Sequence, residues 1–199
     1  MSLSTEISLQ RQSIRNHIRT RRRQLTERQQ ADAADLLVNR ALADPRIAAA
    51  DTLALFLSFD GELDTRPLIE ALWRRNKRIF LPVLHPFSPG HLLFQQYAAD
   101  TPLVLNRLHI SEPRLDVTRL LPLARLDIMF TPLVAFDARG QRLGMGGGFY
   151  DRTLRHWRRD GGFYPIGLAH DCQQVETVPV EPWDIPLPEI VTPSRHWRW

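Results

Sequence analysis

A cluster of glycines in the second half of the chain constrains the fold more than any other feature. Five of the ten glycines fall between Gly140 and Gly148, so glycine is concentrated here rather than scattered. The apolar residues 126–130 predict a strand before the cluster, and residues 151–159 predict a helix after it. Strand, glycine loop and helix form the arrangement in which backbone N–H groups and a helix N-terminus hold phosphate. Glycine suits such a loop because a Cβ would keep the anion away from the backbone.

The glycine cluster matches neither of the two best-known phosphate-binding motifs. Residues 144–149 read Gly-Met-Gly-Gly-Gly-Phe, whereas the dinucleotide fingerprint needs glycine where Phe149 stands, and a Walker A loop ends in Gly-Lys and then Ser or Thr. A glycine-rich hairpin or surface loop is therefore an open alternative. Arg142 and Arg152 are cations suited to phosphate oxygens, and Asp151 offers a hard oxygen ligand for Mg²⁺. These flanking residues favour a nucleotide-phosphate site.

A basic segment precedes the predicted domain core. Arg11, Arg15 and Arg19 recur every four residues and share one face if residues 10–24 form a helix; residues 1–9 are expected to fray. Three interpretations stay open: a solvated helix face, an arm for nucleic acid, and a helix that lends arginines to a phosphate bound elsewhere. The net charge of +4, with every basic residue except Lys77 an arginine, suits phosphorylated ligands and nucleic acid alike. No aromatic residue is interleaved for base stacking.

The hydrophobic pattern predicts an α/β fold: an open, mostly parallel Rossmann-like sheet with helices on both faces and an N-terminal helical arm. Strands are predicted over residues 52–59, 78–83, 126–130 and 165–169, with an antiparallel edge strand over 92–97 and an irregular segment over 106–116. A helix capped by Asp64 or Thr65 completes a βαβ unit. The Thr26–Gln29 segment has the form of a capping box that begins a helix, which Asp44 and Pro45 should end.

At 199 residues and 43% apolar content, the chain is long enough for a single compact domain over residues 1–199, with residues 1–24 as a basic arm packed on it. The one cysteine forms no internal disulfide, which fits a reducing compartment. No apolar run reaches the roughly 18 to 20 residues of a membrane span. The start of the chain lacks the apolar segment of a secretory leader. We therefore expect a cytoplasmic location, no membrane partner and a monomer.

Polar residues follow the first predicted strand at the edge where α/β sheets bind ligands. Asp60 and Glu62 are site candidates there, although acids in turns are more often solvated. His170 follows a later strand and is more typical of a hydrogen-bonded surface group than of a catalytic one.

The segment from Pro132 to Arg152, PLVAFDARGQRLGMGGGFYDR, resembles the signature of the 5-formyltetrahydrofolate cyclo-ligase (methenyltetrahydrofolate synthetase) family. The resemblance covers nearly the whole chain, including residues 56–62 and 178–192. It implies a reaction in which Mg-ATP closes 5-formyltetrahydrofolate to 5,10-methenyltetrahydrofolate, with release of ADP and phosphate. ATP would activate the formamide oxygen as an imidoyl-phosphate-like intermediate, and folate N10 would then attack the activated carbon. Another ATP-dependent phosphoryl-activating ligase and a basic nucleic-acid-binding module are the alternatives.

The resemblance also implies residue roles. The ATP contacts would be Arg11, Arg15, Arg142, Leu143, Gly144, Met145, Gly146, Gly147, Gly148, Phe149 and Tyr150. Magnesium would be held by Asp151 and Asp184, and the folate, with or without a polyglutamate tail, would contact Leu57, Glu62 and Tyr150. Arg142 and Tyr150 are the expected catalytic residues, since the reaction needs charge neutralisation and positioning but no protein nucleophile. The family resemblance implies no nucleic-acid partner. Many members have arginine in place of Met145 and tyrosine in place of Phe149.

Overall fold

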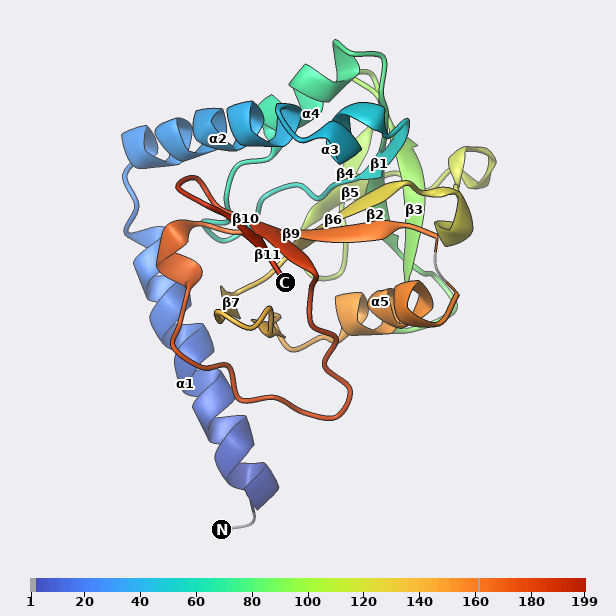
Figure 1. Cartoon of the computed structure of the whole chain (residues 1–199). Helices are drawn as coiled ribbons and strands as arrows, with labels where there is room; N and C mark the ends of the chain where they lie inside the picture. The colour runs from blue at the N-terminus through green and yellow to red at the C-terminus, as the bar shows by residue number, and fades with distance from the viewer. Residues whose placement is uncertain (1–2, 161) are drawn as a thin grey trace.

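A seven-stranded sheet forms the centre of the molecule in the computed structural model, which describes residues 3–160 and 162–199 (Figure 1). The strand order is β11-β10-β9-β6-β1-β2-β3. These strands are β1 (Thr52–Ala54), β2 (Arg78–Leu84), β3 (Leu92–Tyr97), β6 (Ile128–Pro132), β9 (Tyr164–Leu168), β10 (Glu189–Val191) and β11 (His196–Arg198). The inner strands run parallel, and only the edge strands β3 and β11 are antiparallel to their neighbours. The predicted open, mostly parallel sheet is confirmed, including its antiparallel edge strand over residues 92–97.

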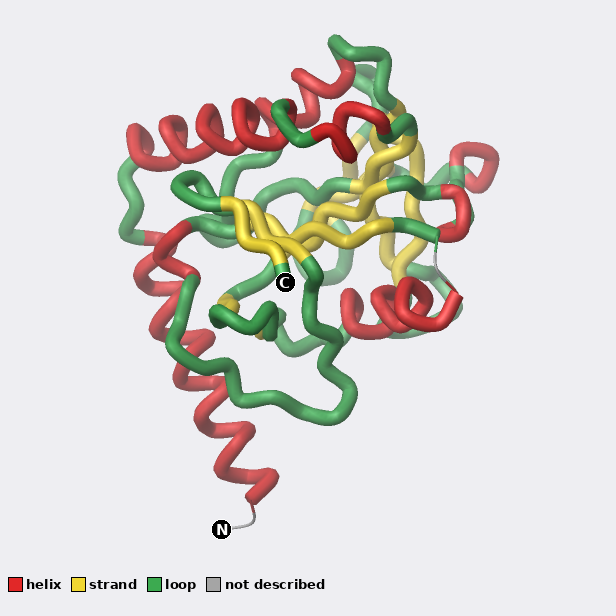
Figure 2. The backbone as a smooth tube through the Cα atoms, in the orientation of Figure 1, coloured by secondary structure: helices red, strands yellow, loops and turns green. Residues whose placement is uncertain are grey.

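Alternate residues of the inner strands face two hydrophobic cores on opposite sides of the sheet. Leu53 and Ile128 belong to one core, whereas Ala54 and Met129 belong to the other. The first core is covered by α2 (Glu27–Leu42), α3 (Pro45–Ala49) and α4 (Arg66–Trp73), and the second by α5 (Phe149–Asp160). Figure 2 shows the strands as a twisted layer with helices on both sides. The near-continuous apolar sequence of these strands follows from this two-sided burial.

Two predicted helix signals have different outcomes. The capping box of α2 is present, because the Thr26 hydroxyl accepts the Gln29 N–H at 3.2 Å and the Gln29 side chain accepts the Thr26 N–H at 2.9 Å. The Asp44-Pro45 pair does more than end α2: the Asp44 carboxylate accepts the Arg46 N–H at 2.8 Å and so caps the short helix α3. Proline is tolerated at that first turn because its missing N–H has no intrahelical partner there.

The N-terminal arm is the helix α1 (Leu3–Arg23), which runs down one side of the molecule (Figure 1). Ile18 of this helix is fully buried against Val134, Ala135, Leu143 and Val178. The helix therefore shares a core with the sheet domain through its C-terminal half. The expected fraying is wrong for the described residues of the segment, since the helix begins at Leu3.

Two predicted strand boundaries and one predicted connection need correction. The first strand ends at Ala54 rather than at residue 59, because the Phe56 carbonyl accepts the Thr65 hydroxyl at 2.5 Å and has left the strand ladder. The third strand is shifted toward the C-terminus, to Ile128–Pro132. The glycine cluster does not follow it directly, because the hairpin of β7 (Ala135–Phe136) and β8 (Arg142–Leu143) lies between them.

A second hairpin occupies part of the segment predicted to be irregular. It consists of β4 (Leu103–Leu105) and β5 (Ser111–Pro113), paired antiparallel. Short 3₁₀ turns complete the chain at Val117–Arg119, Leu123–Arg125 and Asp171–Gln173. Within the described ranges, no helix combines the length and the apolar character needed to cross a membrane.

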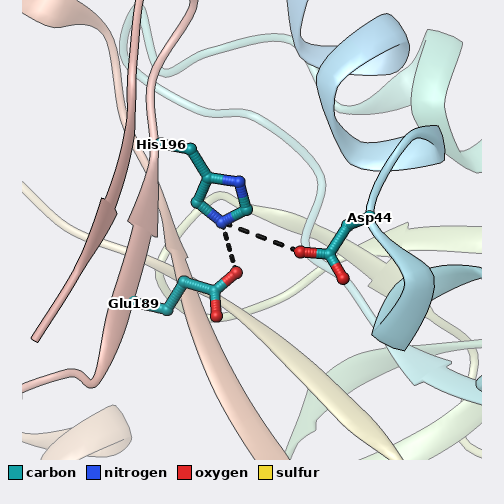
Figure 3. A group of neighbouring side chains, drawn as sticks. All are labelled: Asp44, Glu189 and His196. Carbon is teal, nitrogen blue, oxygen red and sulfur yellow. Dashed lines mark hydrogen bonds and ion pairs between the residues drawn. The ribbon is translucent and has the colours of Figure 1, made fainter.

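A buried ion-pair network ties α3 to the C-terminal strands. Asp44, Glu189 and His196 form the one group of three potential metal ligands found among the described residues (Figure 3). Each carboxylate already holds an arginine: Asp44 accepts Arg198 Nη2 at 2.6 Å, and Glu189 accepts Arg46 Nη1 at 2.8 Å. Two negative charges are thus balanced by two arginines. Both carboxylates are therefore already paired, and the group holds β11 in place without requiring a cation.

Candidate active site

A cavity of about 590 Å³ opens at the carboxyl ends of the central strands. Its walls come from α1, the segment after β1, the β4–β5 hairpin and the glycine cluster. Most of the sequence-predicted site residues line it: Arg11, Arg15, Leu57, Glu62, Arg142, Gly144, Met145, Gly146, Gly147, Gly148, Phe149, Tyr150 and Asp151. Segments far apart in the sequence therefore meet at one site, at the edge where open α/β sheets bind ligands.

The glycine loop has a backbone that other residues would not readily adopt. Gly146 has φ 105° and Gly148 has φ 69°, both in the left-handed region. A Cβ on Gly147 would lie 2.8 Å from the Phe149 ring. The loop leads directly into α5, whose first N–H groups have no intrahelical acceptors. These N–H groups and the helix dipole make the end of the loop suitable for an anion.

Arg142 is the buried cation of the site. Its residue is 3% exposed, and its Nη2 donates to Asp151 Oδ1 at 2.5 Å. Its Nε has no hydrogen-bond partner among the described residues, although the atom is buried. Burial lowers the pKa of this guanidinium, while the charges of Asp151 and Asp184 raise it. Arg142 thus lines the cavity beside the glycine loop and keeps one buried donor unpaired among the described residues.

Two arginines of α1 complete the cationic side of the cavity. Arg11 Nη1 donates to the Pro179 carbonyl at 2.8 Å, and its Nη2 donates to Asp184 Oδ1 at 3.0 Å. Arg15 Nε donates to the Gly144 carbonyl at 2.8 Å, which connects the helix to the glycine loop. Burial and the neighbouring charge of Arg11 lower the pKa of Arg15. Both arginines therefore lie close enough together to share one polyanionic ligand.

Glu62 and Tyr150 also line the cavity. The Phe59 N–H donates to Glu62 Oε2 at 3.0 Å. Burial raises the pKa of Glu62 to about 7, against a smaller opposing effect of Arg22. Burial also raises the pKa of the Tyr150 hydroxyl, and the charge of Glu62 adds to the rise. Tyr150 consequently stays a neutral hydroxyl, whereas Glu62 titrates near neutral pH.

Some predicted site residues lie elsewhere than expected. The Leu143 side chain is fully buried in the core cluster that contains Ile18, so that side chain cannot contact a nucleotide. Asp184 does not line the cavity, because its carboxylate holds Arg11 and accepts the Glu181 N–H at 2.8 Å. Arg152 holds the glycine loop by hydrogen bonds: its Nη1 donates to the carbonyls of Gly147 and Gly90 at 2.9 and 3.2 Å.

His170 is buried, at 3% exposure, and the expectation of a surface group is wrong. Its Nε2 has no hydrogen-bond partner in the described part of the chain. Burial and the charge of Arg22 lower the pKa of this imidazole to about 4, so it is neutral at neutral pH. His170 lies against the main chain of Gly61 and Glu62 and does not line the cavity.

Sequence reasoning missed the contribution of the β4–β5 hairpin to the cavity. Asn106, Ile110 and Glu112 line it. Glu112 Oε2 accepts the Leu84 N–H and the Asn106 side-chain amide, each at 3.0 Å, and so attaches the hairpin to β2. The strands of this hairpin are too short and too exposed to show a periodic pattern. The position of Glu112 in a short strand-like stretch was the one sequence signal for this hairpin, and it is weak.

The arginines of α1 do not form an outward basic face. Arg19, Arg22 and Arg23 all hold the Asp60 carboxylate, and Arg11 and Arg15 are bound as described above. Arg21 and Arg23 are exposed, but Arg23 is held by Asp60. The interpretation of the helix as a nucleic-acid arm therefore loses its main support, as does the interpretation of a solvated face.

Known proteins similar in sequence share one activity in their names. The sequence model of the 5-formyltetrahydrofolate cyclo-ligase family matches residues 7–193. The chain is 60% identical over 182 residues to the 5-formyltetrahydrofolate cyclo-ligase of Escherichia coli strain K12, which covers 92% of this chain and 100% of that protein. It is 52% identical over 181 residues to the 5-formyltetrahydrofolate cyclo-ligase of Haemophilus influenzae strain Rd, with 91% and 96% covered.

Solved structures agree with this result. The structure of Aquifex aeolicus 5,10-methenyltetrahydrofolate synthetase matches with a TM-score of 0.80 at 26% identity, over 94% of this chain and 92% of that chain. A 5,10-methenyltetrahydrofolate synthetase from Mycoplasma pneumoniae matches with a TM-score of 0.72 at 22% identity, over 92% and 98%, and supports the fold alone. With the family match spanning nearly the whole sequence, the chain belongs to the 5-formyltetrahydrofolate cyclo-ligase family.

Proposed function

We propose that the cavity catalyses the ATP-dependent cyclisation of 5-formyltetrahydrofolate to 5,10-methenyltetrahydrofolate. The formamide oxygen would take the γ-phosphoryl group from ATP, releasing ADP. Folate N10 would then attack the activated carbon, and phosphate would leave. The observation that carries the proposal is one cavity lined by a buried arginine, a glycine loop, a carboxylate and a tyrosine. The arginine and the loop suit a polyphosphate, and the carboxylate and the tyrosine suit a polar heterocycle.

The nucleotide side fits a triphosphate by its own chemistry. The buried Arg142 Nε lacks a partner among the described residues, and the glycine loop ends at the N-terminus of a helix of 12 residues. Arg11 and Arg15 add two further cations at the same wall. Backbone N–H groups, a helix N-terminus and converging arginines are what a phosphoryl-transfer site needs to neutralise charge.

Magnesium fits the donor set with one clear candidate ligand. Mg²⁺ is usually bound through one or two carboxylates together with substrate phosphates and water, so a preformed cage of three protein ligands is not required. Asp151 lines the cavity, and its side chain is 17% exposed. Asp184 is the second candidate, and it would act at the metal only after releasing Arg11. When bound, the cation would neutralise phosphate charge and help to orient the transferred group.

The folate side rests on Glu62, Tyr150 and Leu57. In its ionised form Glu62 can accept hydrogen bonds from the N–H groups of a pterin, while Leu57 offers an apolar surface for the ring. Tyr150 keeps its proton and can donate to a substrate oxygen. We also propose that the enzyme works as a cytoplasmic monomer with no nucleic-acid partner; the ion pairs of Arg19, Arg22 and Arg23 with Asp60 support the last point, because they occupy arginines of the arm.

The decisive assay mixes the purified protein with Mg-ATP and 5-formyltetrahydrofolate and follows methenyl-folate absorbance together with ADP release. Matched appearance of both products is expected. ADP without methenyl product would indicate that the cavity binds ATP, but it would favour a related ligase that acts on another formamide or carboxylate. Absence of both, with salt-dependent RNA binding, would instead favour the nucleic-acid alternative.

Replacing Arg15 with Gln is expected to raise KM for ATP by about tenfold, because a hydrogen bond to a charged group contributes roughly 1.5–3 kcal/mol. The KM for the folate should change less than about twofold, since Arg15 contacts the glycine loop at Gly144 and not the Glu62 side. Arg21→Gln, which removes an exposed arginine of the same helix, is the matched control and should behave as wild type. Equal weakening of both substrates would argue against a dedicated phosphate role for Arg15.

The pH dependence of folate use should report Glu62. With its pKa raised to about 7, Glu62 is mostly protonated below that pH and mostly ionised above it. Because the ionised form accepts the pterin N–H groups, kcat/KM for the folate, measured at saturating Mg-ATP, should rise as pH increases through about 7. Glu62→Gln should lower kcat/KM at pH 8 and should remove the rise of kcat/KM with pH, since kcat/KM reports the ionisable groups of the free enzyme. If kcat/KM of the variant still rose through pH 7, another group would be responsible for the pH dependence.

A further inference from the structure

The loop after β1 faces two ways. Glu62 lines the cavity, whereas Asp60, two residues earlier, is directed to α1 and is not part of the cavity lining. The backbone between them is unusual, with φ 55° at Asp60 and φ 74° at Gly61. A non-glycine residue in this left-handed region adopts a sparsely populated conformation, which persists only where surrounding contacts hold it.

Three arginines of α1 supply those contacts. Arg19 Nε and Arg22 Nη2 donate to Asp60 Oδ2 at 2.6 and 3.1 Å, and Arg23 Nε donates to Oδ1. Arg22 Nε also donates to the Asp60 main-chain carbonyl at 2.8 Å. The Asp60 side chain is 5% exposed and that of Arg22 is fully buried, so solvent screens the cluster little. Charge-assisted hydrogen bonds of this kind are shorter and stronger than neutral ones.

Close packing allows the loop little freedom. A Cβ on Gly61 would lie 3.2 Å from the Arg22 carbonyl oxygen, so the loop rests directly on the last turn of α1. Gln30 of α2 donates its side-chain amide to the Gly61 carbonyl at 3.2 Å. The main chain of Asp60 and Gly61 is therefore fixed from two helices.

The position of Glu62 follows from this fixed turn. The Glu62 N–H donates to the Phe59 carbonyl at 3.1 Å, and the Phe59 N–H donates back to Glu62 Oε2 at 3.0 Å. Both bonds span the residues whose backbone the arginines hold. If Asp60 were released, the turn would be free to leave its left-handed conformation and to carry the Glu62 carboxylate with it.

We propose that Asp60, held by Arg19, Arg22 and Arg23, is a positioning residue for folate recognition, because it fixes the turn that presents Glu62 to the cavity. This inference rests on the proposed function, in which Glu62 contacts the folate. Asp60 itself touches no substrate. Its role is to keep the cavity carboxylate in a geometry that a short turn would not hold alone.

The test replaces Asp60 with Asn, which has a similar shape and tolerates the left-handed conformation but lacks the charge. The KM for 5-formyltetrahydrofolate should rise on the order of tenfold to a hundredfold, the range that misplacement of a positioning group produces. The kcat and the KM for ATP should change less than about threefold, because Arg15 contacts the glycine loop without involving Asp60. Direct binding of the folate without ATP, measured by calorimetry, should weaken in parallel.

Two further variants separate positioning from general destabilisation. Asp44→Asn removes an equally buried carboxylate that pairs with Arg198 outside the cavity; it should lower the melting temperature without changing the KM for folate. Arg23→Gln removes one partner whose side chain is 55% exposed, so it should fold normally and raise the KM for folate by a smaller factor than Asp60→Asn. This milder variant keeps the test informative if Asp60→Asn does not fold.

The outcomes are distinct. A folded Asp60→Asn protein with a wild-type KM for folate would overturn the inference, as would an unchanged KM in Arg23→Gln when Asp60→Asn does not fold. Equal rises in KM for ATP and folate would also overturn it, because they would indicate displacement of the whole helix. If the wild type forms no methenyl product, the proposed function fails and the inference fails with it.

Discussion

Replacing Arg142 with Gln is expected to lower kcat by about 10³-fold, within the range known for arginines that neutralise charge during phosphoryl transfer. The guanidinium is buried at 3% exposure and is held by Asp151, while its Nε has no partner among the described residues. A preorganised donor in a site with little water stabilises developing charge far better than a solvated one. Methenyl-folate formation at saturating substrates, fitted for kcat, is the measurement.

The choice of replacement tests the chemistry of the group. Arg142→Lys keeps the positive charge but loses the planar fork, so only part of the activity should return. Arg139→Gln is the matched control, because Arg139 lies on the same hairpin, pairs with Asp137 at 3.1 Å and has a side chain that is 65% exposed. It should keep wild-type activity. A folded Arg142→Gln protein within tenfold of the wild-type kcat would remove Arg142 from the catalytic residues.

The conformation of the glycine loop could be predicted because its determinants are local. Glycines that need left-handed φ values, and a helix start directly after them, are visible in a short stretch of sequence. Burial of the sheet on both faces was also predictable, because inner parallel strands have near-continuous apolar sequences. Strand ends were harder to predict. The Thr65 hydroxyl donates a hydrogen bond to the Phe56 carbonyl, and the apolar pattern of the sequence does not reveal this contact.

Long-range contacts account for what could not be predicted. Asp60 and Glu62 both looked like turn acids, yet one holds three arginines and the other lines the cavity. Spacing put Arg11, Arg15 and Arg19 on one helix face, but only packing decides which acid or carbonyl each one meets. The same holds for His170, whose burial comes from elements distant in sequence. Local sequence patterns therefore predicted the glycine loop, whereas the contacts that surround the cavity could be found only from the fold.

Replacing Asp151 with Asn is expected to reduce Mg-ATP turnover on the order of 10²-fold or more, because the proposed magnesium ligand loses its charge. Asparagine keeps an oxygen that can accept the 2.5 Å hydrogen bond from Arg142, so the arginine should stay in place. Turnover measured against Mg²⁺ concentration is the readout. The variant should need more Mg²⁺ for half-maximal rate, and excess metal should restore part of the activity.

The ion pair raises a competing explanation, namely that Asp151 only orients Arg142. A double-mutant cycle with Arg142→Gln separates the two. If Asp151 serves only to hold the arginine, the double variant should be no slower than Arg142→Gln alone, and the Mg²⁺ dependence of Asp151→Asn should match wild type. If Asp151 binds the metal, its loss should slow even the Arg142→Gln enzyme. The reason is that the Asp151 carboxylate would act on Mg²⁺, whereas Arg142 would act on the phosphate. The shift in Mg²⁺ requirement, rather than the loss of rate, is therefore what would identify Asp151 as the magnesium ligand.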